Sequence, residues 1–387
     1  MNDMDQAKKF AFDVGFVFSA SVIGMLLGFV ITIILARYLG AEDLGLYRMS
    51  IVIFGIVTLF TTLGIPAAIV KYVAEDRDDI DRISRFISSG IITVLILSLV
   101  LSIILYMMSK EIAKIFEMPK LAELLKILSI VFPFASINQV MLGLLNGLRE
   151  MKKYATSLII QSVLMVIIAP ILIFHFGVVG AVIGFVSSTV LTSVFLIWIC
   201  RRYFYFTFEE YKQIAKRLLK FGSQVFSANA INWINYRADM LMIGYFLTAT
   251  HVGYYAVAVS LSRFFWIIPN AIQRVTYPVT SEYWVKNDHT RLQKMINMCI
   301  KISTCILLPL GLIIGFFAEV IIVTIFGDKF IYSVLPLQLL LIGTIIDGST
   351  TRPIGASLAS IGRPDLNLKI VSISCLLYTS PSPRDRG

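Results

Sequence analysis

Residues 86–108 read FISSGIITVLILSLVLSIILYMM, a stretch of 23 residues without a charged side chain. A bilayer core of about 30 Å requires about 20 apolar residues in helical form. Runs of this kind recur along the chain, and an eleventh begins near Leu366. We predict ten complete spans, at 12–36, 46–70, 86–108, 122–146, 155–175, 178–200, 221–247, 252–278, 297–318 and 331–358. The sequence therefore predicts an all-α, polytopic membrane protein.

The composition agrees with a membrane protein. Hydrophobic residues make up 57% of the chain and charged residues 15%, whereas soluble domains carry roughly 25% charged residues. The first apolar run is too long for a signal peptide and lacks a cleavage site. The four cysteines form no CxxC pair, and no Walker A motif is present. We therefore expect a transporter rather than an enzyme, with no cofactor, no metal site and no nucleic-acid partner.

The basic residues indicate an orientation. Lysine and arginine are concentrated before the first span and in the even-numbered loops, and such residues mark the cytoplasmic side of a membrane protein. We predict a cytoplasmic N-terminus and a location in the cell (inner) membrane. The sixth loop, RRYFYFTFEEYKQIAKRLLK at 201–220, is predicted to be an amphipathic helix at the cytoplasmic interface. It would connect two halves, and a calmodulin-like or lipid-sensing role is the alternative.

The two halves of the chain resemble each other. ARYLGAEDLGLYRMSI at 36–51 aligns with GYFLTATHVGYYAVAV at 244–259, so that Gly45 meets Gly253 at an offset of 208. LNGLREMKKY at 145–154 aligns with ASIGRPDLNL at 359–368 at an offset of 214. Similar offsets at two places predict two six-helix bundles related by a parallel repeat.

The predicted bundles cover residues 1–205 and 206–374. By symmetry the second bundle is truncated, with four complete helices and part of a fifth. The last residues, CLLYTSPSPRDRG at 375–387, abandon the apolar pattern, and we expect them to be a non-native tail.

Polar residues at membrane depth are costly and mark candidate sites. Span seven carries Asn229, Asn232 and Asn235 at three-residue intervals, followed by Arg237 and Asp239. Residues three apart share one face of a helix, so the asparagines form a polar stripe. This stripe lines a hydrophilic cavity or makes interhelical hydrogen bonds, and the sequence leaves both interpretations open. Arg237 and Asp239 cannot share a helix face, so we expect Asp239 to bind another helix.

Two arginines are candidate ligands for an anionic substrate. Arg48 lies near the start of span two and Arg263 in the middle of span eight, without an acidic residue at i±3 or i±4. The planar guanidinium matches two oxygens of a phosphate group, and snorkelling or ion pairing is the alternative. In span ten, Asp347 and Arg352 are expected to be partners, with a structural or coupling role.

The quoted motifs carry a family resemblance. The chain resembles the oligosaccharide flippases, the polysaccharide-transporter branch of the multidrug/oligosaccharidyl-lipid/polysaccharide exporter superfamily. The resemblance rests on ILARYLGAEDLGLYRMSIVIF at 34–54, NYRADMLMIGYFLTATHVGYYAVA at 235–258, and the pair NGLREMKKY and ASIGRPDLNLK. It implies two six-helix bundles and alternating access. It also implies export of a polyprenyl-diphosphate-linked oligosaccharide for surface polysaccharide or glycan assembly.

The same resemblance implies roles for particular residues and partners. Arginines in the central cavity would bind the diphosphate and sugar acids, and Arg48 and Arg263 suit that role by position. The implied partners are the lipid-linked oligosaccharide, membrane lipids and glycan-assembly enzymes.

Two other functions compete with glycan export. The first is a cation-coupled drug or metabolite antiporter of the same superfamily, a branch that relies on an acidic residue in the cavity of the first half. The second is a membrane glycan polymerase or ligase, which would normally carry catalytic groups on a large outer loop. The longest predicted outer loop has about a dozen residues, which argues against the polymerase.

Overall fold

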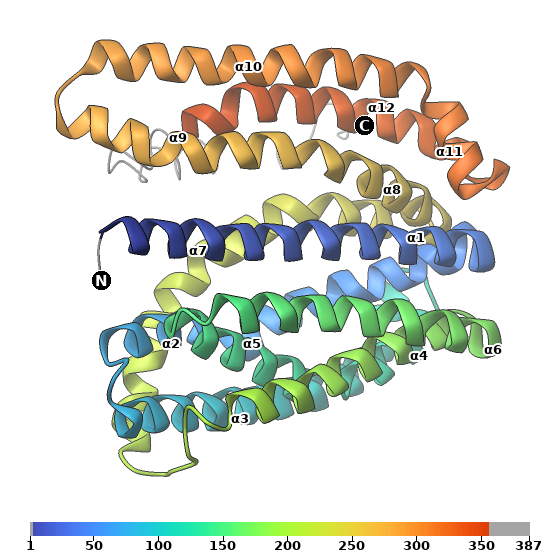
Figure 1. The fold of residues 1–387 in the computed structure, drawn as a ribbon. Coiled ribbons are helices and arrows are strands. Elements are labelled where there is room, and N and C mark those ends of the chain that lie inside the picture. Colours follow the sequence, from blue (N-terminus) through green and yellow to red (C-terminus); the bar gives the residue numbers. More distant parts are fainter. Residues whose placement is uncertain (1–2, 356–387) are drawn as a thin grey trace, which may run out of the picture. The chain divides into compact units, whose positions relative to one another are not determined.

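The described part of the protein consists of helices joined by short non-helical connections. The computed structural model describes residues 3–355, and no strand occurs among them. The chain divides into two compact units, Met1–Ala256 and Val257–Gly387, each described here by itself (Figure 1). The predicted eleventh span near Leu366, the segment 359–368 and the tail 375–387 lie outside the described residues. The predicted bundle boundaries stay a prediction.

The helices follow one another with short connections. The first unit contains α1 (Asp3–Thr62), α2 (Ile65–Glu75), α3 (Ile80–Ile115), α4 (Leu121–Ser129), α5 (Phe132–Gly147), α6 (Met151–Cys200), α7 (Tyr211–Phe246) and the start of α8 (Ala249–Ser262). The second unit begins within α8 and contains the 3₁₀ turn η1 (Arg263–Trp266), α9 (Ile267–Val285), α10 (His289–Phe316), α11 (Ala318–Phe326), the 3₁₀ helix η2 (Asp328–Ser333), α12 (Val334–Ile346) and the π-helical turn η3 (Asp347–Thr351).

Two long helices each contain a glycine that divides them into two arms. α1 kinks at Gly40, with φ 80°, and α6 kinks at Gly177, with φ 59°. Glycine adopts positive φ without the steric penalty of a Cβ atom. Among the described residues, six helices are long and apolar enough to cross a membrane, or seven if α4 and α5, bent by 53°, form one span. Because α1 and α6 each supply two arms, the first unit accounts for the six spans predicted before residue 200.

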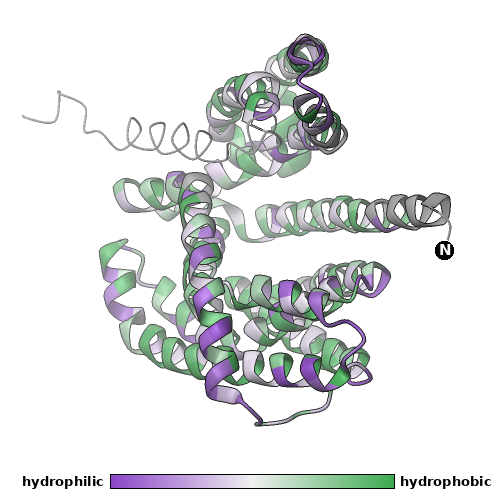
Figure 2. Ribbon diagram, turned by 90° about the vertical axis from the view of Figure 1, so that its left-hand side faces the viewer, coloured by the Kyte–Doolittle hydropathy of each residue, from purple (hydrophilic) through white to green (hydrophobic). Residues whose placement is uncertain are grey.

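The connector between α6 and α7 differs from the predicted amphipathic helix. Residues 204–208 are extended, and α7 begins only at Tyr211. The prediction of a helix over 201–220 is therefore wrong for the first ten residues. The physical reason is that the Tyr205 and Thr207 N–H groups donate to serine hydroxyls on α3 instead of to helical carbonyls. In Figure 2 hydrophilic residues gather in the loops and along α7, while most other helices are hydrophobic.

The core of the first unit forms where α2, α3 and α5 meet. Ile69, Ile87 and Leu144, one from each helix, are fully buried in this cluster. Gly147 allows α5 to approach α2 closely, because a Cβ atom there would lie 2.8 Å from the Cβ atom of Val73. Removing apolar side chains from water or lipid and packing them at this density fixes the arrangement of the three helices.

The two copies of the sequence repeat touch each other at equivalent residues. A Cβ atom on Gly45 would lie 1.7 Å from the carbonyl oxygen of Ala249. A Cβ atom on Gly253 would lie 1.9 Å from the carbonyl oxygen of Ala41. Both pairs exchange under the offset of 208 residues, and a reciprocal contact of this kind is what a two-fold axis produces. Small residues four apart let the backbones of α1 and α8 approach closely.

The second unit packs α9, α10 and α12 together. The Thr276 hydroxyl on α9 lies 3.2 Å from the Cys299 sulfur on α10, and both residues are buried. Gly348 in η3 lies against Pro269 on α9, where a Cβ atom would come within 2.8 Å of the proline ring. The π-helical turn thus sits where three helices converge.

Candidate functional site

A cavity with both apolar and polar lining residues opens between α1 and α6 in the first unit. Its volume is about 220 Å³. Both arms of each kinked helix contribute to its wall, since the breaks at Gly40 and Gly177 turn the two arms toward each other. The lining residues are Gly24, Leu27, Gly28, Ile31, Tyr47, Arg48, Gln161, Ser162, Met165, Phe185 and Ser188.

Arg48 is the one charged residue of this lining. Its Nη2 donates a hydrogen bond to the Thr32 hydroxyl, and that hydroxyl donates to the Gly28 carbonyl at 2.8 Å. The buried Nε of Arg48 has no hydrogen-bond partner. A guanidinium carries five N–H donors, so Arg48 keeps donors for a ligand after binding Thr32.

Arg237 adds positive charge to the same region. It is half-buried on α7, and its charge acts on Arg48 through space. α7 lies against the second arm of α1, where the Trp233 indole is 3.0 Å from a Cβ position at Gly55. Two like charges held in one protein region favour an anionic ligand with more than one negative charge.

Asp239 binds a neighbouring helix, as the sequence predicts. One carboxylate oxygen accepts a hydrogen bond from the Tyr255 hydroxyl on α8, and the other accepts from the Met240 N–H at 2.7 Å. No ion pair within the described residues joins Asp239 to Arg237. Asp239 therefore ties α7 to α8, and a coupling role for it stays a prediction.

Of the three asparagines of the predicted polar stripe, the side chain of Asn229 alone belongs to the described part of the structure. Asn229 lies exposed on α7, whereas the side chains of Asn232 and Asn235 lie outside the described part. The backbone of all three is helical, so their three-residue spacing keeps them on one face. The choice between a cavity lining and interhelical hydrogen bonds stays open for this stripe.

Arg263 belongs to the second unit and starts the 3₁₀ turn η1. Within the predicted span 252–278 the helix changes to 3₁₀ type at this residue, while Ala249–Gln273 remains one apolar helix long enough to cross a membrane. Pro269 lacks the N–H group that would donate to the Phe265 carbonyl, which favours a local change of helix type. The Arg263 side chain is exposed, and its proposed contact with substrate stays a prediction.

Asp347 and Arg352 come together at the π-helical turn. Arg352 Nε lies 3.8 Å from Asp347 Oδ2, and its Nη1 donates to Asn270 Oδ1 at 3.2 Å. The Arg352 guanidinium also stacks 4.5 Å from the Trp266 ring centroid. These contacts link η3 to α9 and η1, so the two residues lie together, and a structural or coupling role for them stays a prediction.

Small polar residues of the cavity escaped the sequence analysis. Gln161, Ser162 and Ser188 of the lining lie within apolar spans, where hydroxyl groups commonly bond to their own helix. Ser188 does so with Phe185 at 2.9 Å.

The sequence and the fold match known proteins. The sequence model of a family described as Polysaccharide biosynthesis protein matches residues 34–335. The chain is 28% identical over 195 residues to Stage V sporulation protein B of Bacillus subtilis. The aligned region covers 48% of this chain and 38% of that protein. It is 23% identical over 364 residues to a putative O-antigen transporter of Shigella flexneri, with 89% and 84% coverage.

A solved structure shares the fold. The lipid II flippase MurJ in an inward closed conformation superposes with a TM-score of 0.74 at 19% identity, over 93% of this chain and 79% of that chain. The chain is thus similar in architecture to a membrane flippase, while it spans well under half the length of the sporulation protein.

Proposed function

The chain belongs to the polysaccharide biosynthesis protein family, and from this premise we propose that it is a flippase for a polyprenyl-diphosphate-linked oligosaccharide. Proteins that it resembles are named as an O-antigen transporter and as a lipid II flippase. These names support a transporter rather than an enzyme. The cargo would serve surface polysaccharide or glycan assembly, with glycan-assembly enzymes as partners.

The observation that carries the proposal is Arg48 at a cavity between two kinked helices, beside Gln161, Ser162 and Ser188. Its guanidinium matches two phosphate oxygens in a planar fork. The positive charge of Arg237 acts on the same region. A diphosphate carries more than one negative charge and would relieve the repulsion between the two cations.

A second cavity, an apolar groove, could accommodate the lipid chain of such a substrate. This groove of about 500 Å³ lies between α1, α3 and α7. Its lining is Ile53, Ile56, Val57, Leu105, Ile112, Phe116, Leu241, Met242, Tyr245 and Phe246. An isoprenoid chain needs apolar surface of this kind, and the groove supports a lipid-linked cargo.

Alternating access follows from the same architecture. The kinks at Gly40 and Gly177 provide points where arms of α1 and α6 can change angle. The reciprocal contact of Gly45 and Gly253 would close one end of the path between the repeats. Arg263, an exposed arginine of the second unit, stays a proposed substrate contact.

The distribution of lysine and arginine supports an orientation. We propose that the N-terminus and the connector 201–210 lie on the cytoplasmic side, as the distribution of basic residues favours, and that the chain resides in the inner membrane. In this orientation the cargo moves from the inner to the outer face.

Glycan display on cells tests the proposal. A host that depends on this protein for its surface glycan should lose display with Arg48→Ala at normal protein abundance. Arg82→Ala is the matched control, because Arg82 is an exposed residue that pairs with Asp76 away from the cavity. Unchanged display in Arg48→Ala would overturn the assignment, and dye efflux driven by an ion gradient would favour the antiporter.

A further inference from the structure

The connector after α6 is held as an extended segment along α3. The Ser84 hydroxyl accepts the Tyr205 N–H at 3.0 Å, and the Ser88 hydroxyl accepts the Thr207 N–H at 3.0 Å. Four residues of α-helix rise about 6 Å, and two residues of extended chain advance about 6.6 Å. The two serines therefore match alternate residues of the connector and fix its register.

The connector carries three exposed aromatic side chains. One of them, Tyr205, is 50% exposed. Phe206 and Phe208 are 53% and 72% exposed. Their rings meet edge to face with centroids 5.2 Å apart. The serines thus display a preformed aromatic pair.

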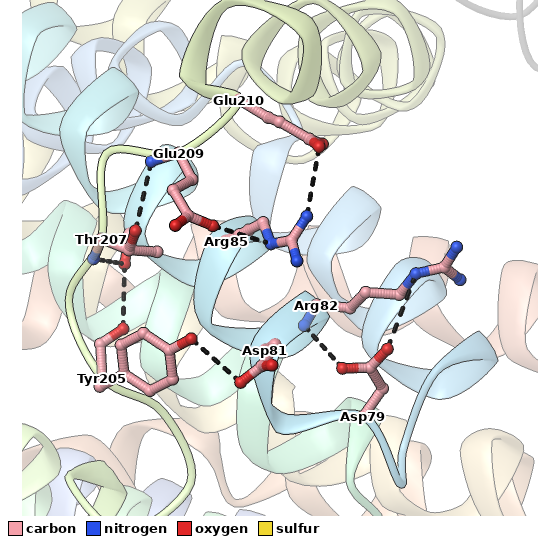
Figure 3. A network of polar contacts seen from close by, with 9 residues as sticks. Asp79, Asp81, Arg82, Arg85, Tyr205, Thr207, Glu209 and Glu210 are labelled. Atoms are coloured by element: carbon pink, nitrogen blue, oxygen red, sulfur yellow. Dashed lines mark hydrogen bonds and ion pairs between the residues drawn. The ribbon is translucent and has the colours of Figure 1, made fainter.

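The acidic groups around the pair are already engaged. Arg85 lies 3.5 Å from a Glu209 carboxylate oxygen and 3.2 Å from a Glu210 carboxylate oxygen. The Tyr205 hydroxyl donates to Asp81 at 3.0 Å, as Figure 3 shows. This hydrogen bond to a carboxylate raises the pKa of the Tyr205 phenol, which keeps its proton.

Uncompensated basic residues lie beside the aromatic pair in the chain. Arg201 and Arg202 are exposed directly after α6, where the structure records no ion pair for them within its described part. The Arg201 guanidinium lies 5.8 Å from the Trp198 ring centroid, and Trp198 is 56% exposed. Exposed aromatic rings with arginine at the end of a span are typical of the membrane–water interface.

We propose that Trp198, Arg201, Arg202, Phe206 and Phe208, which we call the connector surface, bind anionic phospholipid headgroups at the membrane interface. The arginines supply the charge complementary to the headgroup phosphates, and the aromatic rings enter the boundary between headgroups and acyl chains. Because the connector joins α6 to α7, this contact holds it at the bilayer surface. The inference requires only that the chain spans a membrane, and it is independent of the transported cargo.

Native mass spectrometry of the purified protein tests this proposal. The protein is titrated with phosphatidylglycerol and, separately, with phosphatidylcholine of the same chain length. We expect the wild type to prefer phosphatidylglycerol. Arg201→Gln with Arg202→Gln should weaken phosphatidylglycerol binding about 30-fold, since each basic residue near an anionic surface contributes about fivefold. Phe206→Ser with Phe208→Ser should weaken the binding of both lipids.

The control removes the same charge elsewhere. Lys110→Gln with Lys114→Gln changes two exposed lysines at the opposite end of α3 and should leave phosphatidylglycerol binding unchanged. Equal helix content by circular dichroism confirms that the variants fold. The proposal fails if the variant with Arg201→Gln and Arg202→Gln still prefers phosphatidylglycerol to the same degree as the wild type. That result is expected if this surface binds an acidic protein instead of a lipid. Because no glycan enters the measurement, this failure is distinct from failure of the flippase assignment.

Discussion

Arg48 donates a hydrogen bond to Thr32, 16 residues earlier and on the other side of the Gly40 kink. The second repeat contains a hydrogen bond between residues separated by the same number of positions. There the Tyr255 hydroxyl donates to Asp239, 16 residues earlier in the chain. Each repeat thus ties its first helix to its second through one polar contact. In the first repeat this tie places a cation at the cavity, and in the second it holds a carboxylate against a phenol.

The Asp239 contact leads to a prediction about coupling. Asp239→Asn keeps an oxygen that accepts the Tyr255 hydrogen bond, so we expect glycan display close to that of the wild type. Asp239→Leu removes the acceptor and should lower the amount of folded protein. Immunoblotting and surface glycan staining measure both effects. Loss of display by Asp239→Asn at wild-type abundance would show instead that the charge itself serves transport.

The crossing of α1 and α8 predicts an unusual intolerance of alanine. Gly45→Ala places a methyl group where the Ala249 carbonyl oxygen lies 1.7 Å away, and overpacking of this kind costs about 1–3 kcal/mol. Gly343→Ala is the control, since nothing lies within 4 Å of its Cβ position on α12. Thermal unfolding in detergent should show a lower midpoint for Gly45→Ala alone. Equal midpoints for the two variants would contradict the close crossing.

The hydrogen bonds between the connector and α3 should protect two backbone amides from hydrogen exchange. In Ser84→Ala with Ser88→Ala, the Tyr205 and Thr207 amides lose their acceptors and should exchange hydrogen about fivefold faster, because each net hydrogen bond contributes about 1 kcal/mol. Ser98→Ala with Ser109→Ala removes two other serines of α3, which bond to their own helix. Hydrogen exchange of the peptide 203–208 should be unaffected by that control. Slow exchange in both double variants would exclude the serine contacts as the cause of protection.

Hydropathy predicts most of the membrane architecture, because bilayer thickness sets a minimum length for each span. The exception is the predicted span 221–247, because α7 is not among the described helices that are apolar enough to cross a membrane. Hydropathy cannot say whether a short polar interval is a loop or a kink. Residues 37–45 read as a loop, yet α1 continues through them with a break at Gly40 alone. Hydropathy also gives no register for the connector, where two serine hydroxyls replace helical hydrogen bonds.

The candidate site is predicted in part. The charge of Arg48 marks it in sequence, because an arginine at membrane depth needs water, a partner or a ligand. The polar wall of Gln161, Ser162 and Ser188 does not stand out, since these residues are 113 to 140 positions away along the chain. Only the fold brings them to Arg48. Sequence spacing also could not reveal that Arg352 stacks on Trp266 while it pairs with Asp347.

The most direct test of the account is transport by the purified protein in lipid vesicles. A polyprenyl-diphosphate-linked oligosaccharide is placed in the vesicle membrane, and its arrival at the other face is read by an added glycan-cleaving enzyme. The account predicts rapid transfer by the wild type and by Arg82→Ala, and transfer at least tenfold slower by Arg48→Ala. Equal rates in vesicles with wild-type protein and in protein-free vesicles would contradict the flippase assignment.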